Sequence, residues 1–442
     1  MRPTLLKLAA ELAAGRTSSV ELTREALSRI DDKQGEGARA FVAVHREAAL
    51  AAAEASDRLR KFGQVPSPLA GIPVSLKDLL DVQGETTRAG SIALADAPPA
   101  VADAPVVARL RAAGAVFVGR TNMTEFAYGG LGINPHYGTP GCPADRSRVP
   151  GGSSSGAGVS AADGMAVIAI GTDTGGSVRI PAAFCGITGF KPTQYRIPRE
   201  GAFPLSWQMD SIGPLAQSVS CCAIVDAILA GVAPDVPGAR PLKLARFALP
   251  KAPFLDAMDQ VVARAFEAAV SELARAGARI EEISLPPVDD ILPIRRFIPI
   301  EAYTHHRALL AKRGEQYDPI IRMRLQEGAS VPAFEYIELK QYRASMIARC
   351  APLTRGYDAV LMPTVAVVPP QIAAARETQD YLALSGLSTR LTSVGNCLDR
   401  CAVSIPCSEP GTLPVGLTLM GEHGADRELL ATALGVEAAL RK

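Results

Sequence analysis

The first 65 residues place apolar side chains at the spacing of amphipathic helices. Leucines and alanines recur through residues 5–14, and Gly15 ends that helix. Ser18 and Glu21 have the spacing of a capping box, which predicts a second helix that runs to about residue 30. An alanine-rich third helix is predicted over residues 46–60, before the prolines of VPSPLAGIP break the pattern. We therefore expect an N-terminal helical segment at about residues 1–65.

Beyond this segment, strand-like apolar runs alternate with helical patterns. Strands are predicted at 72–77, 115–118, 165–170, 278–283, 359–362 and 403–405, and helices at 104–113, 156–162 and 261–276. The run at 165–170 is continuously apolar, as in a strand buried on both faces. This rhythm predicts an α/β fold, in which helices cover both faces of a mostly parallel sheet. Without an internal repeat or a long polar linker, we expect a single domain over residues 1–442.

Composition and charge narrow the range of partners. The 442 residues are 48% apolar and 21% charged, which is typical of a globular protein with a large core. The 46 Lys and Arg against 45 Asp and Glu leave a net charge of +1, so we expect no nucleic-acid partner. No apolar run reaches about 18 residues, so we expect no membrane partner. Lys7 and Glu11 interrupt the N-terminal apolar run, which favours an amphipathic helix over a signal peptide and hence a cytoplasmic location.

Cysteine and histidine spacing gives no strong metal pattern. None of the eight cysteines is paired as CxxC, so we expect reduced, buried thiols of a cytoplasmic protein. Cys397 and Cys401 have i,i+4 spacing, and His305 and His306 are adjacent. Two ligands alone make a weak metal site, so we expect none.

The most informative segment runs from Pro150 to Thr193. It holds two glycine–serine clusters, 151–155 and 175–177, on either side of the predicted buried strand. A flexible linker would be polar throughout, whereas each cluster adjoins apolar sequence. A phosphate loop needs GxxxxGK[ST], and no such lysine follows the glycines. Two interpretations remain open, a pair of tight turns with incidental serines and a catalytic site.

The catalytic interpretation centres on Ser177, which is predicted to open a helix with Pro181 in its first turn. The first N–H groups of a helix lack intrahelical partners and carry the positive end of the helix dipole. Gly175 and Gly176 allow the backbone to approach a ligand closely. This pattern favours an oxyanion hole beside a serine hydroxyl, which suits acyl transfer.

A serine nucleophile also needs a base. None of the five histidines stands in a motif with evident catalytic geometry. Lys77, in GIPVSLKDLLD, ends a strand that looks buried and has apolar neighbours on both sides. A lysine is usually solvated at the surface, but burial here would lower its pKa and leave a neutral amine that can act as the base.

Six blocks of this chain resemble those of the amidase signature hydrolases, in the order of that family. They are GIPVSLKD, TNMTEFAYG, PGGSSSGA, GTDTGGSVRIPAAFCGITGFKPT, YDAVLMPT and LPVGLTLMG, and they span about residues 65–440. The resemblance implies the family's three-layer α/β/α fold, whose central mixed, mostly parallel sheet is covered by helices.

The resemblance also implies a Ser–Ser–Lys triad, in which Lys77 matches the lysine, Ser153 the bridging serine and Ser177 the nucleophile. The family's bridging serine follows a cis peptide bond, so we expect one between Gly152 and Ser153. Further matches are an oxyanion hole formed by the backbone of Thr174, Gly175, Gly176 and Ser177, and supporting positions at Ser154, Asp173 and Arg179. Asp210 lies in a block similar to the family's DSxGP segment, which implies a structural role.

A stand-alone amidase is the function that this resemblance implies. It would hydrolyse small aliphatic or aryl carboxamides through a Ser177 acyl-enzyme, without metal or cofactor. Two alternatives stay open, the amidase subunit of a glutamyl-tRNA amidotransferase and a urea-derivative hydrolase of the allophanate type. The amidotransferase subunit carries an NLARYDG-type block that is absent from residues 301–324.

The substrate pocket is predicted from aromatic and apolar residues in the flanking segments. Met123, Tyr128, Phe203 and the single tryptophan, Trp207, are either pocket residues or ordinary core and surface residues. The expected partner is a small-molecule amide. The N-terminal helices also leave open a homodimer.

Overall fold

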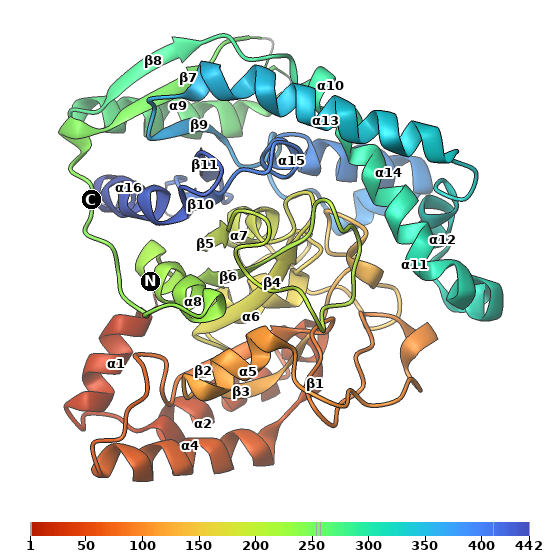
Figure 1. The fold of residues 1–442 in the computed structure, drawn as a ribbon. Helices are drawn as coiled ribbons and strands as arrows, with labels where there is room; N and C mark the ends of the chain where they lie inside the picture. Colours follow the sequence, from red (N-terminus) through yellow and green to blue (C-terminus); the bar gives the residue numbers. More distant parts are fainter. Residues whose placement is uncertain (1, 253, 257, 410, 442) are drawn as a thin grey trace.

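One sheet organises the chain in the computed structural model, which describes residues 2–252, 254–256, 258–409 and 411–441 (Figure 1). Its eleven strands lie in the order β1-β3-β2-β4-β6-β5-β10-β11-β9-β7-β8. They are β1 (Phe41–Val44), β2 (Pro73–Lys77), β3 (Val116–Thr121), β4 (Ile168–Asp173), β5 (Thr188–Lys191), β6 (Ser211–Ala216), β7 (Arg246–Pro250), β8 (Arg279–Ile283), β9 (Ala359–Pro363), β10 (Ala402–Pro406) and β11 (Gly416–Met420).

Helices cover both faces of the sheet because successive strand residues point to opposite sides. In β4, Ile168 and Ile170 belong to one hydrophobic core and Ala169 to another. The first core is covered by α1 (Leu5–Ala13), α5 (Pro105–Ala112), α8 (Val219–Ala230), α9 (Gln260–Arg275) and α16 (Asp426–Leu440). The second is covered by α2 (Ser19–Asp31), α4 (Arg46–Lys61), α6 (Ser155–Asp163) and α7 (Arg179–Cys185), and the short α3 (Gly37–Ala40) lies against α6. These layers make a three-layer α/β/α fold.

The remaining helices form a group of their own (Figure 1). They are α10 (Val288–Ile291), α11 (Phe297–Arg313), α12 (Pro319–Gln326), α13 (Ala333–Thr354), α14 (Thr378–Thr389) and α15 (Thr392–Cys397). Side chains from α11, α12 and α14 line a pocket that also contains Ser177. This group therefore borders the candidate site.

The N-terminal helices agree with the prediction, but the segment also contains a strand. Ser18 accepts from the Glu21 N–H and Glu21 accepts from the Ser18 N–H, which is the predicted capping box. The four residues of β1 pair antiparallel with β3 at the edge of the sheet. Four residues are too few for a periodic pattern, so the sequence predicts helix alone in this segment.

The sheet is mixed, as the resemblance implies, but it is not mostly parallel. Four strand pairings are parallel and six are antiparallel. The pattern predicts neither β6 nor β11, and both join antiparallel neighbours. The strand β6 reads SIGPLA and is buried throughout, so it shows no alternation of apolar and polar residues.

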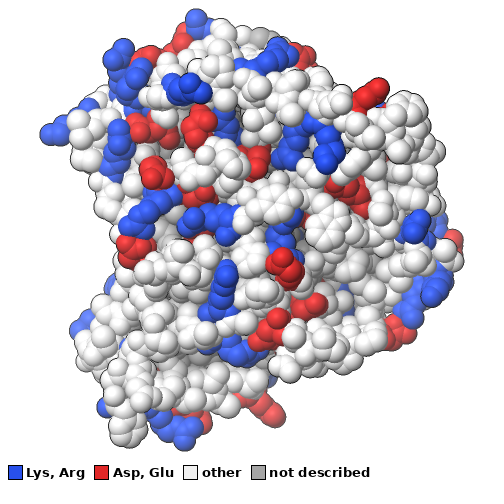
Figure 2. Space-filling model, viewed as in Figure 1, with Lys and Arg blue, Asp and Glu red and all other residues white. Residues whose placement is uncertain are grey.

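Charged residues of both signs are interspersed over the face shown in Figure 2 rather than gathered by sign. Among the described residues, no helix is long and apolar enough to cross a membrane. All eight cysteines are free, and all but Cys407 are buried. The described part of the chain also contains no cluster of three or more His, Cys, Asp or Glu side chains arranged to hold a metal.

Candidate active site

The candidate site lies where two neighbouring parallel strands end. Lys77 is the last residue of β2, and Thr172 is the second-last residue of β4. Parallel strands bring their carboxyl ends to the same edge of a sheet, which is where α/β folds place ligands. The Lys77 Nζ lies 2.8 Å from the Ser153 Oγ and 2.8 Å from the Thr172 Oγ1. The structure therefore joins Lys77 to Ser153, although 76 residues separate them in sequence.

Lys77 is fully buried, with 0% of its surface exposed. Burial lowers the pKa of its amine to about 7, against the charges of Asp210 and Asp173, which raise it. A lysine with such a pKa is largely neutral just above neutral pH. The neutral amine has a free lone pair, so it can accept a proton from the Ser153 hydroxyl.

Ser153 lies in a tightly packed loop before α6. The peptide bond between Gly152 and Ser153 is cis, as the resemblance implies. A side chain on Gly152 would place its Cβ 2.5 Å from the backbone nitrogen of Gly132, so only glycine fits. The neighbouring Ser154 supports the loop, since its hydroxyl donates to the Thr172 carbonyl at 3.3 Å.

Ser177 lies in the turn between β4 and α7, and the helix begins two residues later than predicted, at Arg179. Its side chain is 7% exposed and borders a pocket. The Ser154 N–H donates to the Ser177 carbonyl at 3.3 Å, so the two serine loops are in contact. Within the described chain, no hydrogen bond joins the hydroxyls of Ser153 and Ser177.

One of the four backbone N–H groups of the predicted oxyanion hole is already bonded within the protein. The Gly176 N–H donates to the Asp173 carboxylate at 2.8 Å, so it is already occupied. The Thr174, Gly175 and Ser177 N–H groups donate no hydrogen bond to the residues that the structure describes, which leaves them open to a ligand. The Gly175 carbonyl accepts hydrogen bonds from Thr392 at 2.7 Å and Ser393 at 3.2 Å, which orient this peptide.

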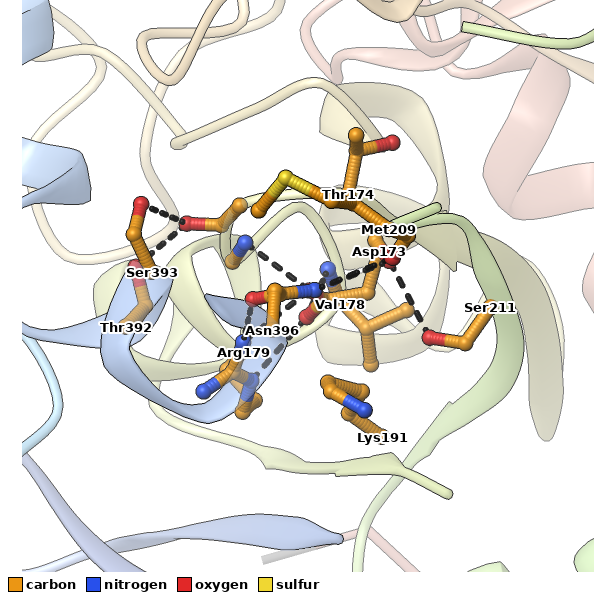
Figure 3. A network of polar contacts seen from close by, with 12 residues as sticks. Asp173, Thr174, Val178, Arg179, Lys191, Met209, Ser211, Thr392, Ser393 and Asn396 are labelled. Carbon is orange, nitrogen blue, oxygen red and sulfur yellow. Dashed lines mark hydrogen bonds and ion pairs between the residues drawn. The ribbon is translucent and has the colours of Figure 1, made fainter. Parts of the chain in front are cut away.

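Asp173 is the centre of a hydrogen-bond network that holds the turn (Figure 3). Its carboxylate accepts from the Gly176 N–H, the Val178 N–H, the Arg179 guanidinium and the Asn396 amide. Burial alone would raise the pKa of Asp173, but the charge and hydrogen bonds of Arg179 outweigh it and lower the pKa to about 2. The Asn396 Oδ1 in turn accepts from Arg179 at 2.7 Å. Asp173 and Arg179 thus shape the backbone around Ser177.

Two adjoining pockets lie beside this turn. The arginine lobe contains Ser177 and Gly175 together with Tyr128, Gly129, Gly130, Arg295, Ile298, Arg324, Ser385 and Thr389. The aromatic lobe contains Phe203 and Trp207 together with Leu79, Thr172, Arg199, Ala202, Pro204, Asp210, Ser211 and Ile212. Ala127, Thr174 and Leu205 line both lobes, so the two pockets are neighbours.

Three of the four predicted pocket residues line these lobes. Tyr128 lies in the arginine lobe, and Phe203 and Trp207 lie in the aromatic lobe. Met123 does not, because it is fully buried in the core and its side chain packs near Gly90. An apolar residue beside a functional block is equally suited to the core, so the sequence did not separate the two roles.

Sequence reasoning missed Thr172, Asn396 and the two arginines of the arginine lobe. Thr172 lies inside the GTDTGGS block, so its place in that motif was an available signal. Asn396 and the arginines come from the helical group and reach the site only through tertiary packing. No local pattern in the sequence marks them.

Comparison with known proteins identifies the family of this chain. The profile of the amidase family matches residues 21–430. A 2-amino-5-chloromuconic acid deaminase from Comamonas testosteroni is 39% identical, across 88% of this chain and 86% of the relative. A glutamyl-tRNA(Gln) amidotransferase subunit from Cupriavidus metallidurans is 34% identical, across 97% and 95%. The crystal structure of an amidase superposes with a TM-score of 0.91 at 33% identity, covering 99% of this chain and 100% of that one. The chain therefore belongs to the amidase family and is an amidohydrolase.

Proposed function

We propose that this amidohydrolase cleaves the C–N bond of small aliphatic or aryl carboxamides through an acyl-enzyme on Ser177. The observation that carries the proposal is the buried amine of Lys77, 2.8 Å from the Ser153 hydroxyl. A lysine acts as a base only when it is neutral, and burial favours the neutral form. Contact between the two serine loops supports a relay from Ser177 through Ser153 to Lys77.

In this proposal, protons pass between Ser177, Ser153 and Lys77 in both halves of the reaction. Neutral Lys77 accepts the proton of Ser153 while Ser153 accepts the proton of Ser177, and the Ser177 Oγ attacks the amide carbonyl carbon. As the tetrahedral intermediate collapses, the C–N bond breaks and Ser153 passes a proton to the leaving nitrogen, drawing one from Lys77. Water then attacks the acyl-enzyme and loses its proton through the same relay. The carboxylate leaves and Ser177 recovers its hydroxyl.

The Thr174, Gly175 and Ser177 N–H groups are the proposed oxyanion donors. They have no protein partner within the described chain, whereas the Gly176 N–H is bound to Asp173. Preorganised donors of this kind are worth about 3–4 kcal/mol each in acyl transfer. The hydrogen bond between the two serine hydroxyls is expected to form when substrate is bound, since catalytic hydrogen bonds often tighten only then.

An amidotransferase component is the second candidate, because the glutamyl-tRNA(Gln) amidotransferase protein from Cupriavidus metallidurans is 34% identical across 97% of this chain. The absence of the NLARYDG-type block argues for a stand-alone amidase instead. We further propose a cytoplasmic location, which the free thiols support.

Ammonia release by the purified chain tests these proposals. A panel of simple carboxamides should yield ammonia without any partner protein, and a fluorophosphonate probe should label Ser177. The Ser177→Ala variant should lose both labelling and turnover, while Ser345→Ala, on the exposed surface of α13, should keep both. Ammonia release only in the presence of a partner would favour the amidotransferase. Normal hydrolysis by Ser177→Ala would reject the scheme.

A further inference from the structure

Two arginines line the same pocket as Ser177 and have no carboxylate partner among the described residues. Arg295 lies just before α11, and Arg324 lies in α12. The Arg324 guanidinium donates to the Tyr128 carbonyl at 2.8 Å and lies 3.9 Å from the centre of the Tyr128 ring. The Arg295 side chain donates no hydrogen bond within the described chain. Both cations are therefore available to a ligand in the arginine lobe.

Neighbouring arginines on the same segments behave differently. Arg296 pairs with Glu335 at 2.9 Å, and Arg322 pairs with Glu315 at 2.6 Å. The unpaired state of Arg295 and Arg324 is therefore a property of the pocket, since the same segments pair their outward arginines with acids. Glu327, whose charge acts on Tyr128, is exposed and forms no ion pair with either pocket arginine in the described chain.

The positive charges of Arg295 and Arg324 favour an anion in the arginine lobe. Burial lowers the pKa of Arg295, and the positive charge of Arg324 acts in the same direction. Both guanidinium groups still stay charged at neutral pH, because an arginine does not deprotonate in proteins. Two cations that share a half-buried pocket repel one another, and a bound anion relieves that repulsion.

Apart from the two arginines, the residues that line the arginine lobe are uncharged. Gly129 and Gly130 pack closely against neighbouring side chains, and Ser385 and Thr389 contribute hydroxyl groups. Among the residues that the structure describes, no acidic side chain lines this lobe, which shares Thr174 with the aromatic lobe. A guanidinium presents a planar fork that matches the two oxygens of a carboxylate.

We propose that the substrate amide carries a carboxylate that Arg295 and Arg324 bind, so that the substrate class is the monoamide of a dicarboxylic acid. The inference rests on the proposed function, because it places the amide carbonyl at Ser177. The carboxylate then lies in the arginine lobe, beside the nucleophile. Recognition of this group fixes the direction in which the chain binds its substrate.

Paired substrates test the inference through a ratio of rates. Malonamate, succinamate and glutaramate are compared with the neutral amides of equal length, and kcat/KM is measured for each from ammonia release. Charge-assisted hydrogen bonds of this kind correspond to about 10- to 100-fold in affinity. The wild-type chain should prefer at least one acid by that factor. The Arg295→Met variant should lose most of the preference, chiefly through KM, and Arg295→Lys should restore part of it.

The matched control is Arg296→Met, which makes the same change one residue away, on an exposed arginine that pairs with Glu335. It should keep the wild-type ratio. An unchanged ratio in Arg295→Met, or no preference in the wild type, overturns the inference while hydrolysis of neutral amides still supports the amidase. Arg324→Met also loses the bond to Tyr128, so Arg295 is the cleaner position for the test.

Labelling protection gives a second readout that does not depend on turnover. Succinate and glutarate should slow fluorophosphonate labelling of Ser177 in the wild type and in Arg296→Met. In Arg295→Met, the same protection should need dicarboxylate concentrations at least 10-fold higher. Equal protection by inorganic phosphate would overturn the assignment to a carboxylate. If the probe labels the wild-type chain but no dicarboxylate slows the labelling, the inference is refuted and the proposed function is not. A chain that is neither labelled nor active refutes the proposed function.

Discussion

Replacing Lys77 by Met should abolish turnover and yet stabilise the fold at neutral pH. The change keeps a side chain of similar length and removes an amine whose pKa burial lowers from 10.5 to about 7. Between these two values the unfolded chain binds a proton that the folded chain does not, so stability falls as pH falls from about 10.5 to about 7. Below about pH 7 both states are protonated and the loss is constant.

The size of the effect follows from this difference. At about 1.4 kcal/mol per pH unit, the interval from 10.5 to about 7 corresponds to about 5 kcal/mol. Methionine also removes the hydrogen bonds to Ser153 and Thr172, which offsets the gain by about 1–2 kcal/mol for each buried hydroxyl. The net stabilisation of Lys77→Met at pH 7 is therefore about 1–3 kcal/mol.

Urea unfolding at two pH values isolates the charge effect, because the hydrogen-bond losses are the same at both. The stability advantage of Lys77→Met over the wild type should be about 3–4 kcal/mol larger at pH 7 than at about pH 10. Lys340→Met, on the exposed surface of α13, is the matched control and should show little change with pH. A stability difference for Lys77→Met that does not vary with pH would refute the neutral buried amine.

Three further predictions concern the same site. The wild-type kcat/KM should rise with pH with an apparent pKa near 7, because only neutral Lys77 accepts a proton. A stopped assay over a pH series measures this profile, and a rise near pH 10 instead would show that the amine is solvated. Asp173→Ala should lower the free energy of unfolding, measured in urea, by about 3–5 kcal/mol, because Arg179 stays buried and unpaired. A decrease below about 1 kcal/mol would show that the fold does not depend on this ion pair. Gly176→Ala should remove activity in the ammonia assay, since φ is +130° and the Cβ would lie 2.2 Å from a threonine hydroxyl of α15. Gly386→Ala, in open space on α14, should keep activity and gain up to about 1 kcal/mol, and similar losses in both variants would count against the steric argument.

The sequence predicts elements whose pattern is complete within a short window. The capping box at Ser18, the buried strand before Ser177 and the lysine that ends β2 are of this kind. The pattern does not predict strands such as β6, because glycine and proline interrupt them and both of their faces are buried. A Cβ at Gly213 would lie 2.0 Å from the Phe190 carbonyl oxygen, so packing against β5 requires glycine where strand propensity disfavours it.

The candidate site divides in the same way. Lys77, Ser153 and Ser177 stand in dense local motifs, and the resemblance that these motifs carry implies that the three residues lie together. Arg295 and Arg324 are ordinary arginines in a charged helical region, and only the packing of that region beside the Ser177 turn makes them pocket residues. The residues proposed to bind the substrate are therefore harder to predict than those proposed to carry out the reaction.

A neutral lysine between two acids needs an explanation, because Asp173 and Asp210 both favour its charged form. Asp173 is held by Arg179, which balances its charge within the same network. Burial raises the pKa of Asp210 and outweighs the hydrogen bonds from Thr174 and two backbone N–H groups and the charge of Arg199, so the charge of Asp210 is itself disfavoured. Both carboxylates therefore favour the protonated form of Lys77 less strongly than two free negative charges would. Burial of Lys77 remains the largest influence on its pKa.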